Sequence, residues 1–499
     1  MYKIIRVVLA IVCVLAITLL FLDFTGTAAR SWGWLAKIQL IPALLSLNVV
    51  ALAVLLVLTL VFGRVYCSVI CPLGVMQDGI NWLRGKIGPR KGRKNRFSYK
   101  RALTWLRVSF LGVFAILVIL GLMSVAALIE PYSEYGRIVS VYLAPVYDSV
   151  NNLLAHEAES RGSFAFYEVE PHAVFVPAMI LAGVTFVVVA AFAWIDGRGY
   201  CNKVCPAGTI LGYLSKFSLL KPTIDTSLCN GCRKCERNCK ASCIDGKNHA
   251  IDYSRCVACM DCIGNCSTGA MKYTWRRYAP EGGADKKGVV DAGRRTFIAT
   301  GLIAAGAAVA KAEDKVTDGG FVPIIKKEKP KRKSKIVPPG AVSVANLERH
   351  CTSCQLCISE CPNGVLRPSM DMSTFMQPEV SYERGYCRPE CTRCSSVCPA
   401  GAIIKIDRAE KSAIQIGHAV VDYDSCLAAT GKSHCGKCSR KCPAEAIEMV
   451  AVNPDAEDSP YMPVVNESRC IGCGACENLC PVGPLSAIHV EGHEVHRKI

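Results

Sequence analysis

The sequence lacks the motifs that mark most substrate-converting enzymes. It has no glycine fingerprint for a dinucleotide, no C-x-x-C-H for covalent haem and no nucleophile motif. These absences argue against hydride transfer, haem-based and nucleophilic catalysis. Acidic residues are also few, with 41 Asp and Glu against 58 Lys and Arg, so the formal net charge is +17. We therefore look for function in the residues that are abundant.

Isolated cysteines are scarce, although the chain has 30 cysteines. All but Cys13 and Cys243 fall into paired or fourfold runs with fixed gaps. Disulfide scaffolds are usually short secreted chains, whereas this chain has 499 residues, and at about 100–200 residues a domain it holds two to four domains. The pattern predicts metal ligation rather than disulfide bonding.

Four apolar runs are candidates for membrane-spanning helices, which need about 20 apolar residues. They cover Val7–Leu22, Ile38–Phe62, Val108–Ile129 and Ala173–Ile195. The first run also resembles a cleavable secretory signal, because Lys3 and Arg6 precede it and small residues follow it. Basic residues gather between the second and third runs and acidic residues between the third and fourth. We therefore expect the N-terminus and the first of these loops on the cytoplasmic side.

Two matching motifs follow the second and fourth apolar runs on that side. They are YCSVICPLG, with Cys67 and Cys71, and YCNKVCPAG, with Cys201 and Cys205. A spacing of four on a helix puts both thiols of a pair on one face, so the two pairs can form one four-thiolate site. Soft thiolates suit copper(I), zinc or iron–sulfur, and buried free thiols that only pack are the alternative. The repeated motif also predicts an internal duplication.

Two runs with the spacing C-x2-C-x2-C-x3-C come next. They are Cys229, Cys232, Cys235, Cys239 and Cys256, Cys259, Cys262, Cys266. This is the spacing of bacterial two-cluster ferredoxins, in which the fourth cysteine of a run ligates the other cluster. By that rule Cys266 completes the first cluster and Cys239 the second. Zinc is the alternative, but zinc sites close with four ligands rather than with overlapping runs.

The last 150 residues contain four more runs, each ending in Cys-Pro. The runs are Cys351, Cys354, Cys357, Cys361; Cys387, Cys391, Cys394, Cys398; Cys426, Cys435, Cys438, Cys442; and Cys470, Cys473, Cys476, Cys480. Their sixteen thiolates predict four further [4Fe-4S] clusters, six in all. Each oxidised cluster with its thiolates carries about −2, which brings the net charge to roughly +5 and leaves no reason to expect nucleic acid.

An export-like segment and a basic stretch separate the two sets of runs. Arg294 and Arg295 precede the apolar run FIATGLIAAGAAVA, which begins at Phe297, and this order matches a twin-arginine signal. Export would place the C-terminal runs in the periplasm. The rival interpretation is a relic, because the apolar run has only 14 residues and a basic segment follows it. The segment Ile324–Gly340 is expected to be a solvated linker.

On these motifs the chain resembles two known families. Residues 1–277 resemble the NapH-type membrane ferredoxins, relatives of the NosR and FixG/CcoG proteins, and residues 291–499 are similar to the NapG-type four-cluster ferredoxins. The resemblance implies a fusion of two partners, which explains why an export signal is internal. It also implies that the first and fourth C-terminal runs exchange their last cysteines, as do the second and third. Cys480 would then join the first run and Cys361 the fourth, with Cys442 in the second and Cys398 in the third.

The expected fold is α+β, with an N-terminal four-helix transmembrane bundle followed by bacterial two-[4Fe-4S] ferredoxin-type domains. The expected boundaries are 1–215 for the membrane domain, 216–280 for the first ferredoxin domain, 281–345 for the export-like segment and linker, and 346–499 for the four-cluster domain. By resemblance we expect a protein of the bacterial inner membrane that passes electrons from quinol to a periplasmic reductase or cytochrome. The alternatives are a copper-related maturation or regulatory protein and a subunit of a larger redox complex.

Oxidation of quinol would require a proton acceptor near the membrane surface. Glu130, Tyr132 and Glu134 lie at the outer end of the third apolar run, and His172 opens the fourth on the same side. An ionisable group at the end of a span is a functional candidate. Ordinary interfacial anchoring by Tyr and Glu is the alternative.

Overall fold

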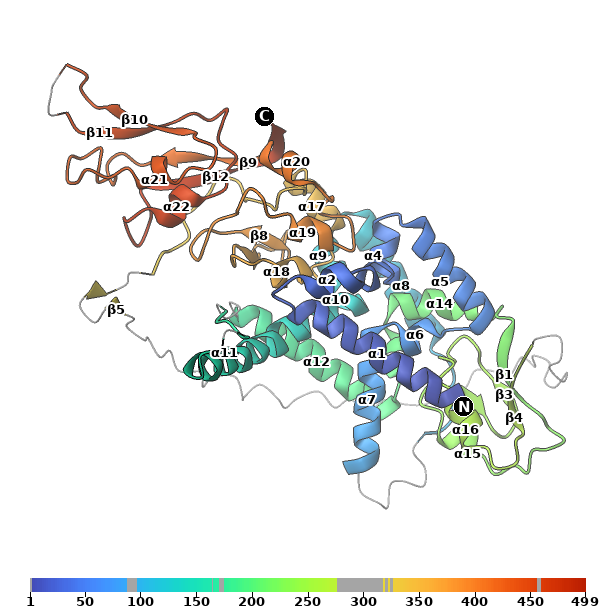
Figure 1. The fold of residues 1–499 in the computed structure, drawn as a ribbon. Coiled ribbons are helices and arrows are strands. Elements are labelled where there is room, and N and C mark those ends of the chain that lie inside the picture. Colours follow the sequence, from blue (N-terminus) through green and yellow to red (C-terminus); the bar gives the residue numbers. More distant parts are fainter. Residues whose placement is uncertain are drawn as a thin grey trace, which may run out of the picture.

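The computed structural model describes residues 2–87, 97–163, 165–169, 175–275, 317–318, 322–323, 326–455 and 459–499. Helices dominate the first 215 residues, and two cysteine-rich units with short strands follow. The two units lie at opposite ends of the helical half (Figure 1). The export-like segment with Arg294, Arg295 and Phe297 is outside the described residues, as is His172.

Two helices in the described part of the chain are long and apolar enough to cross a membrane, by length and composition. They are α1 (Tyr2–Leu22) and α12 (Val176–Asp196), each of 21 residues. The second and third apolar runs form shorter helices instead, namely α5 (Val49–Phe62) and α8 (Thr104–Ile119). The described residues therefore do not contain four single spanning helices, and the second and third predicted spans are each interrupted.

The interruptions have local causes in the backbone. The second run divides into α4 (Leu40–Leu45) and α5, because Leu47 takes a φ of 50° and the Asn48 side chain accepts a hydrogen bond from the Ala51 N–H at the start of α5. The third run is interrupted after α8, because Gly121 takes a φ of 75° that stops the helix. Two short turns then follow, α9 (Met123–Ala126) and η2 (Ala127–Ile129).

The helical half contains a repeated arrangement. The apolar helix α5 leads to the short helix α6 (Tyr66–Val69) and then to α7 (Pro72–Ile87). In the same way α12 leads to α13 (Gly199–Lys203) and then to α14 (Pro206–Ser215). In both copies the proline of the C-x3-C-P motif is the first residue of the third helix, a position where its missing N–H costs nothing. The predicted internal duplication is confirmed at this level.

The remaining helices of this half complete the packing around the repeats. They are α2 (Thr27–Trp32), α3 (Trp34–Lys37), α10 (Pro131–Ile138), the π-helix η3 (Val139–Leu143) and α11 (Ala144–Ser160). Helix α7 packs against α10 and α12, and α1 packs against α6 and α7. A core of buried side chains runs through these contacts and continues into the C-terminal unit.

The first cysteine-rich unit is a small ferredoxin-like body. Strand β1 (Leu220–Ile224) pairs antiparallel with β4 (Met271–Trp275), and β2 (Ile244–Asp245) pairs with β3 (Ala250–Ile251). Each cysteine run ends in a single helical turn, α15 (Lys234–Arg237) or α16 (Asp261–Gly264). The unit is fixed to α5 by backbone and side-chain bonds: Leu219 N–H donates to Leu60 O at 2.7 Å and Tyr273 OH to Phe62 O at 2.8 Å.

The C-terminal unit repeats this plan with more strands. Its antiparallel pairs are β7 (Leu366–Pro368) with β8 (Pro378–Val380), β9 (Ile414–Val421) with β12 (Ile488–Lys498), and β10 (Ile447–Ala451) with β11 (Tyr461–Val465). Its helices are α17 (Val344–His350), α18 (Leu356–Ser359), α19 (Arg393–Val397), α20 (Arg408–Ser412), α21 (Lys437–Arg440) and α22 (Ala475–Leu479). A short pair, β5 (Thr317–Asp318) with β6 (Val322–Pro323), precedes the unit.

The basic segment before this unit is not the solvated linker that its composition predicts. Lys327 donates from Nζ to the carbonyl oxygens of Glu477 and Cys480, both at 2.7 Å. Arg332 forms an ion pair with Glu477, and both side chains are only 4% exposed. Ile336 and Val337 are buried in the core. The described part of this segment, from residue 326 on, is therefore part of the C-terminal unit.

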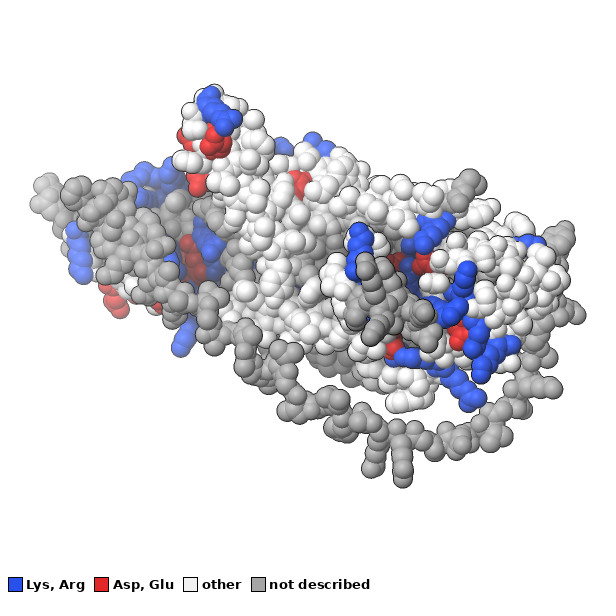
Figure 2. Space-filling model, turned by 90° about the horizontal axis from the view of Figure 1, so that it is seen from below, with Lys and Arg blue, Asp and Glu red and all other residues white. Residues whose placement is uncertain are grey.

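Helix α1 contacts both cysteine-rich units, one at each end. At its N-terminal end Lys3 forms an ion pair with Asp261 of the first unit at 3.0 Å. Just beyond its other end, Arg393 of the C-terminal unit donates to the carbonyl oxygen of Phe24 at 2.8 Å. Between these ends, Figure 2 shows a broad face on which charged side chains are sparse.

Candidate metal centres

The four regular cysteine runs share one backbone shape. In each, the second and fourth residues after the first cysteine have φ between 49° and 76°. These residues are Gly231, Arg233, Ala258, Met260, Ser353, Gln355, Gly472 and Gly474. Five of the eight carry side chains that disfavour this left-handed region. Left-handed residues at every second position turn successive backbone N–H groups toward a common centre. A loop of this shape can wrap an anion such as a thiolate-ligated cluster.

In the first unit Cys239 and the second run group as the ferredoxin rule predicts. Cys262 is buried beside the other two cysteines of its run and beside Cys239, and burial together with these thiols raises its pKa. The crossing of Cys239 to the second run is therefore confirmed. Cys235 lies beside Cys229 and Cys232. Cys266 packs into the same small core as these residues.

In the C-terminal unit the thiols form four groups that differ from the ones implied by family resemblance. Cys351, Cys354, Cys357 and Cys398 line one pocket, and Cys442, Cys470, Cys473 and Cys476 line another. Cys426, Cys435, Cys438 and Cys480 line a third. Cys394 lies beside Cys387, Cys391 and Cys361. The first run thus exchanges its last cysteine with the second, and the third with the fourth. The implied exchange of the first with the fourth and of the second with the third is wrong.

The helices explain this correction. Helix α18 of the first run packs against α19 of the second, and α21 of the third against α22 of the fourth. The hairpin β7–β8 returns the chain directly from the first run to the second. Two ordinary two-cluster units therefore follow one another along the chain. Spacing within the runs carries no information on which helical turns pack together, so the sequence left this choice open.

The fourth cysteine of a run also receives backbone donors. Ile403 N–H donates to Cys398 Sγ at 3.5 Å, and Ala446 N–H donates to Cys442 Sγ at 3.3 Å. Among the described residues, no three His, Cys, Asp or Glu side chains are placed to share a single metal ion. Each C-terminal group nonetheless offers four thiols. Wrapped loops, N–H to sulfur bonds and four thiols fit [4Fe-4S] clusters.

The two C-x3-C-P motifs come together inside the helical half. Cys67, Cys71, Cys201 and Cys205 are all buried, and burial and the other three thiols raise the pKa of Cys205 well above its ordinary value. Gln77 donates from Nε2 to Cys201 Sγ at 3.1 Å, and Gly208 N–H donates to Cys205 Sγ at 3.3 Å. The predicted meeting of the two motifs is confirmed, and we call this group the four-thiol centre.

Two buried arginines surround the four-thiol centre. Arg64 donates to Cys67 Sγ at 3.7 Å and to the carbonyl oxygen of Ser254, two residues before Cys256, at 3.2 Å. Arg198 donates to Cys67 O at 2.7 Å and pairs with Asp78 at 2.8 Å. Both guanidinium groups are fully buried, so they favour an anionic centre. Arg64 and Arg198 each precede the first cysteine of their motif by three residues, so the repeat R-x-Y-C-x3-C-P was a signal that sequence reasoning missed.

On its other side the four-thiol centre adjoins the residues predicted as proton acceptors. Tyr200, next to Cys201, donates to Glu134 Oε1 at 2.6 Å, and burial raises the pKa of Glu134 to about 8. Glu130 caps α10 by accepting from the Tyr132 N–H at 3.1 Å. Glu130, Tyr132 and Glu134 are all buried within the protein. Tyr132 lies beside Cys354 of the C-terminal unit, so this polar group separates the four-thiol centre from the first C-terminal group.

Cys243, which the sequence left unassigned, lies within the first unit. Its Sγ is 3.5 Å from Cys239 Sγ, and it also interacts with Cys256. Both partners belong to the group predicted to hold the second cluster. Only the spacing of four from Cys239 hinted at this position. Cys13 remains half-buried on α1, apart from these groups.

Comparison with known proteins supports the iron–sulfur assignment. A family model described as a 4Fe-4S binding domain matches residues 45–90 and 176–224, the two segments that carry the C-x3-C-P motifs. A second, described as a 4Fe-4S dicluster domain, matches residues 433–483. No solved structure matches the chain.

Curated relatives match about a third of the chain. The methylamine utilization ferredoxin-type protein MauM of Methylobacillus flagellatus is 28% identical over 148 residues, which are 29% of this chain and 62% of MauM. The ferredoxin-type protein NapF of Escherichia coli is 28% identical over 159 residues, 32% of this chain and 87% of NapF. NapG of Escherichia coli is 31% identical over 157 residues, 29% and 64% of the two chains. The chain thus contains iron–sulfur, ferredoxin-type domains and is related to these ferredoxins.

Proposed function

We propose that the chain is a membrane-bound conductor of electrons between the quinol pool and a redox protein, such as a reductase or cytochrome, in the periplasm. The observation that carries this proposal is the order of the thiol groups. They extend from the first unit, through the four-thiol centre, to the C-terminal unit at the opposite end of the helical half. Such a series suits electron transfer, because no substrate-converting motif accompanies it.

Membrane location is supported by the outer faces of the apolar helices. Val8 on α1, Val57 on α5, Ile116 on α8 and Ile180 on α12 are each more than half exposed. In α1 and α12 only 22% of the apolar window is buried within the molecule. Contiguous apolar surface on this scale requires a partner or a bilayer. We therefore propose a multi-pass protein of the inner membrane in which the broken helices of the second and third runs also lie in the bilayer.

We also propose an orientation, which is supported by the basic residues of the sequence after α7. By the positive-inside rule these residues favour a cytoplasmic first unit, and a C-terminal unit at the opposite end would then be periplasmic. This arrangement agrees with a fusion of a NapH-type membrane ferredoxin with a NapG-type exported ferredoxin. It also gives the internal twin-arginine pattern a use, since that route exports folded domains with their clusters in place.

We assign [4Fe-4S] clusters to the six groups of the two units and an iron–sulfur cluster to the four-thiol centre. Each such cluster, when bound, supplies a one-electron redox couple whose potential depends on nearby charge, hydrogen bonds and burial. The chain's own contribution is to set these surroundings. Arg64, Arg198 and Gln77 direct positive charge and hydrogen bonds to the four-thiol centre, which favours its reduced, more negative state.

The first test is exchange with a quinol. The intact chain, purified anaerobically with its clusters, is mixed with a menaquinol analogue while absorbance and EPR follow cluster reduction; the reverse reaction uses dithionite-reduced protein and quinone. Exchange in either direction supports the proposal. A fully loaded protein that exchanges in neither direction contradicts it.

A copper-related maturation role is the second candidate, because four buried thiols also suit copper(I). Copper binding by the purified chain that disappears when Cys67, Cys71, Cys201 and Cys205 are all changed to serine would favour it. Iron bound by the same four residues, without copper, would leave electron transfer as the function.

A further inference from the structure

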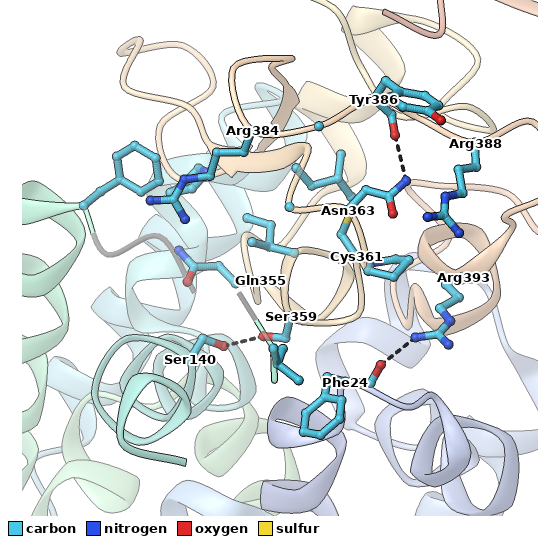
Figure 3. Close-up of a pocket in the computed structure, with 18 of the residues that line it drawn as sticks. Phe24, Ser140, Gln355, Ser359, Cys361, Asn363, Arg384, Tyr386, Arg388 and Arg393 are labelled. Carbon is cyan, nitrogen blue, oxygen red and sulfur yellow. Dashed lines mark hydrogen bonds between the residues drawn. The ribbon is translucent and has the colours of Figure 1, made fainter. Parts of the chain in front are cut away.

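A cavity of about 570 Å³ lies between the helical half and the C-terminal unit. Phe24, Ser140, Val141, Phe175 and Ala178 form the helical wall. The opposite wall comes from the loop after α18 and from the chain around the second C-terminal run (Figure 3). The two walls touch at the cavity's edge, where the hydroxyl groups of Ser140 and Ser359 are 3.1 Å apart.

The cavity adjoins two candidate clusters. Cys361, which groups with the second run, lines its wall (Figure 3). Gln355 lines it as well and also lines the pocket of the first group, the one completed by Cys398. A molecule bound here is therefore next to two redox centres, which favours a redox-active ligand.

Gln355 supplies an independent indication of a ligand. Its side chain is only 5% exposed, yet its Nε2 has no hydrogen-bond partner in the protein. A buried unpaired donor costs free energy that an acceptor oxygen on a ligand would recover. The residue also occupies a left-handed conformation, with φ of 66°, so its place in the wall is fixed by the loop around the cysteines.

The position of the cavity indicates the class of ligand. Phe175 is the N-cap of the apolar helix α12 and Ala178 lies in its first turn. Phe24 follows the end of α1, so the helical wall is at the end of two candidate spans. Arg388 and Asn363 bring polar groups from the other side (Figure 3). The volume is typical of sites for small organic ligands, and the mixture of an apolar wall with a few donors is typical as well.

We propose that this cavity binds the head group of a quinol or quinone, with Gln355 donating to one of its oxygens. The inference rests on the proposed function and gives it a location at the boundary of the membrane. Oxidation of one quinol releases two electrons and two protons. The electrons leave singly to the two adjoining clusters, and the protons leave to solvent past the exposed Glu168 at the rim.

The test uses the intact, cluster-loaded chain in lipid nanodiscs and two cavity-filling variants, Ala178→Trp and Ser140→Phe. Ile180→Trp is the matched control, because Ile180 is on the same helix but 63% exposed. One readout is labelling by a photoreactive azidoquinone, mapped to peptides. The other is quinol-driven cluster reduction, with dithionite-driven reduction as the check on cluster integrity.

We expect wild-type label in peptides of the cavity wall, and at least about a tenfold loss of labelling and of quinol-driven reduction in both filling variants. Dithionite-driven reduction should be unchanged, and Ile180→Trp should behave as wild type. Gln355→Leu should weaken quinone binding about 3- to 10-fold while its clusters stay loaded, as expected for one lost hydrogen bond.

The outcomes separate the location from the function. Quinol-driven reduction that persists undiminished in both filling variants, with label elsewhere, overturns the cavity as the site and leaves the proposed function standing. Absence of any quinol-driven reduction in the wild-type protein overturns the proposed function itself. Label in the cavity that Gln355→Leu does not weaken overturns the role of that side chain.

Discussion

At the scale of single residues, cysteines alone do not define the centres. The left-handed residues between them shape the loops, and they include Ala258, Met260, Ser353 and Gln355, none of which favours that conformation. Buried arginines and a glutamine, rather than lysines at the surface, supply positive charge and hydrogen bonds to the sulfur atoms of the four-thiol centre. The residues around the cysteines are therefore where cluster properties can be altered without loss of the cluster.

The exchange of cysteines between C-terminal runs can be tested by counting iron. A parent variant with Cys351, Cys354 and Cys357 changed to serine should lose one cluster, about four iron atoms. Adding Cys398→Ser should remove no more iron, because Cys398 belongs to the same group. Adding Cys480→Ser instead should remove about four more, because Cys480 belongs to a different group. The reverse pattern of iron loss would contradict the structure's pairing.

Glu134 should make stability depend on pH. Burial raises its pKa from 4.5 to about 8, so the folded protein keeps a proton that the unfolded chain loses over this interval. The free energy of unfolding should therefore fall as pH rises from about 4.5 to about 8 and level off above it. Glu134→Gln should remove this part of the fall, measured as the unfolding midpoint against pH. Equal slopes in the variant and wild type would refute the assignment, and Glu157→Gln, at an exposed pair, is the control.

At the scale of elements, the molecule is organised by junctions between helices and the first unit. Asp78 on α7 accepts from Arg6 on α1 at 2.9 Å, from Arg198 at 2.8 Å and from Lys240 of the first unit at 2.9 Å. Three cations hold the pKa of Asp78 well below its usual range, even though burial acts in the opposite direction. This one carboxylate connects both copies of the repeat to the ferredoxin unit.

Removing the Asp78 carboxylate should lower the stability of the folded protein. Asp78→Ala leaves the fully buried Arg198 without its carboxylate partner. A loss of about 3–5 kcal/mol of stability is typical when one partner of a buried pair is deleted. The expected result is a lower thermal midpoint of the purified protein, with early release of the first unit's iron. Glu157→Gln breaks only an exposed pair and should change little. A midpoint within a degree of wild type would show that the junction is not structural.

The contribution of Asp78 should also have a definite pH dependence. Because its folded pKa is depressed, its stabilisation is present above the unfolded value of 3.8 and is lost as pH falls through the folded pKa. The difference between Asp78→Asn and wild type in unfolding midpoint should therefore be constant from neutral pH down to about 4 and shrink below it. A difference that grows on acidification would contradict the ion network.

The helices and thiol groups show which features of the fold the sequence could predict and which it could not. The cysteine spacing predicted that Cys239 joins the second run, and the repeated C-x3-C-P motif predicted the four-thiol centre, because both depend on local geometry. The two interrupted spans were missed, since a left-handed Leu47 gives no compositional signal. The pairing of C-terminal runs and the packing of Arg332 against Glu477 were missed because both depend on contacts between distant segments.

At the scale of the whole molecule, the two cysteine-rich units lie at opposite ends of an apolar helical half. If that half spans the membrane, the chain carries redox centres on both sides and one centre between them. The Arg294–Arg295 pattern, outside the described residues, would then serve to export the C-terminal unit. We expect a reporter fused to the C-terminus to be found in the periplasm. When both arginines are changed to lysine, the reporter should remain in the cytoplasm. Cytoplasmic activity of the unaltered fusion would contradict export.

The central claim is that electrons can pass through the molecule from one unit to the other, and one measurement tests it directly. The cluster-loaded chain is reconstituted into sealed vesicles with ferricyanide trapped inside and no quinone, and dithionite is added outside. We predict reduction of the trapped ferricyanide at a rate far above that of protein-free vesicles. We also predict its loss when Cys67, Cys71, Cys201 and Cys205 are all changed to serine. Vesicles whose protein clusters are reduced from outside while the trapped ferricyanide stays oxidised would contradict the claim.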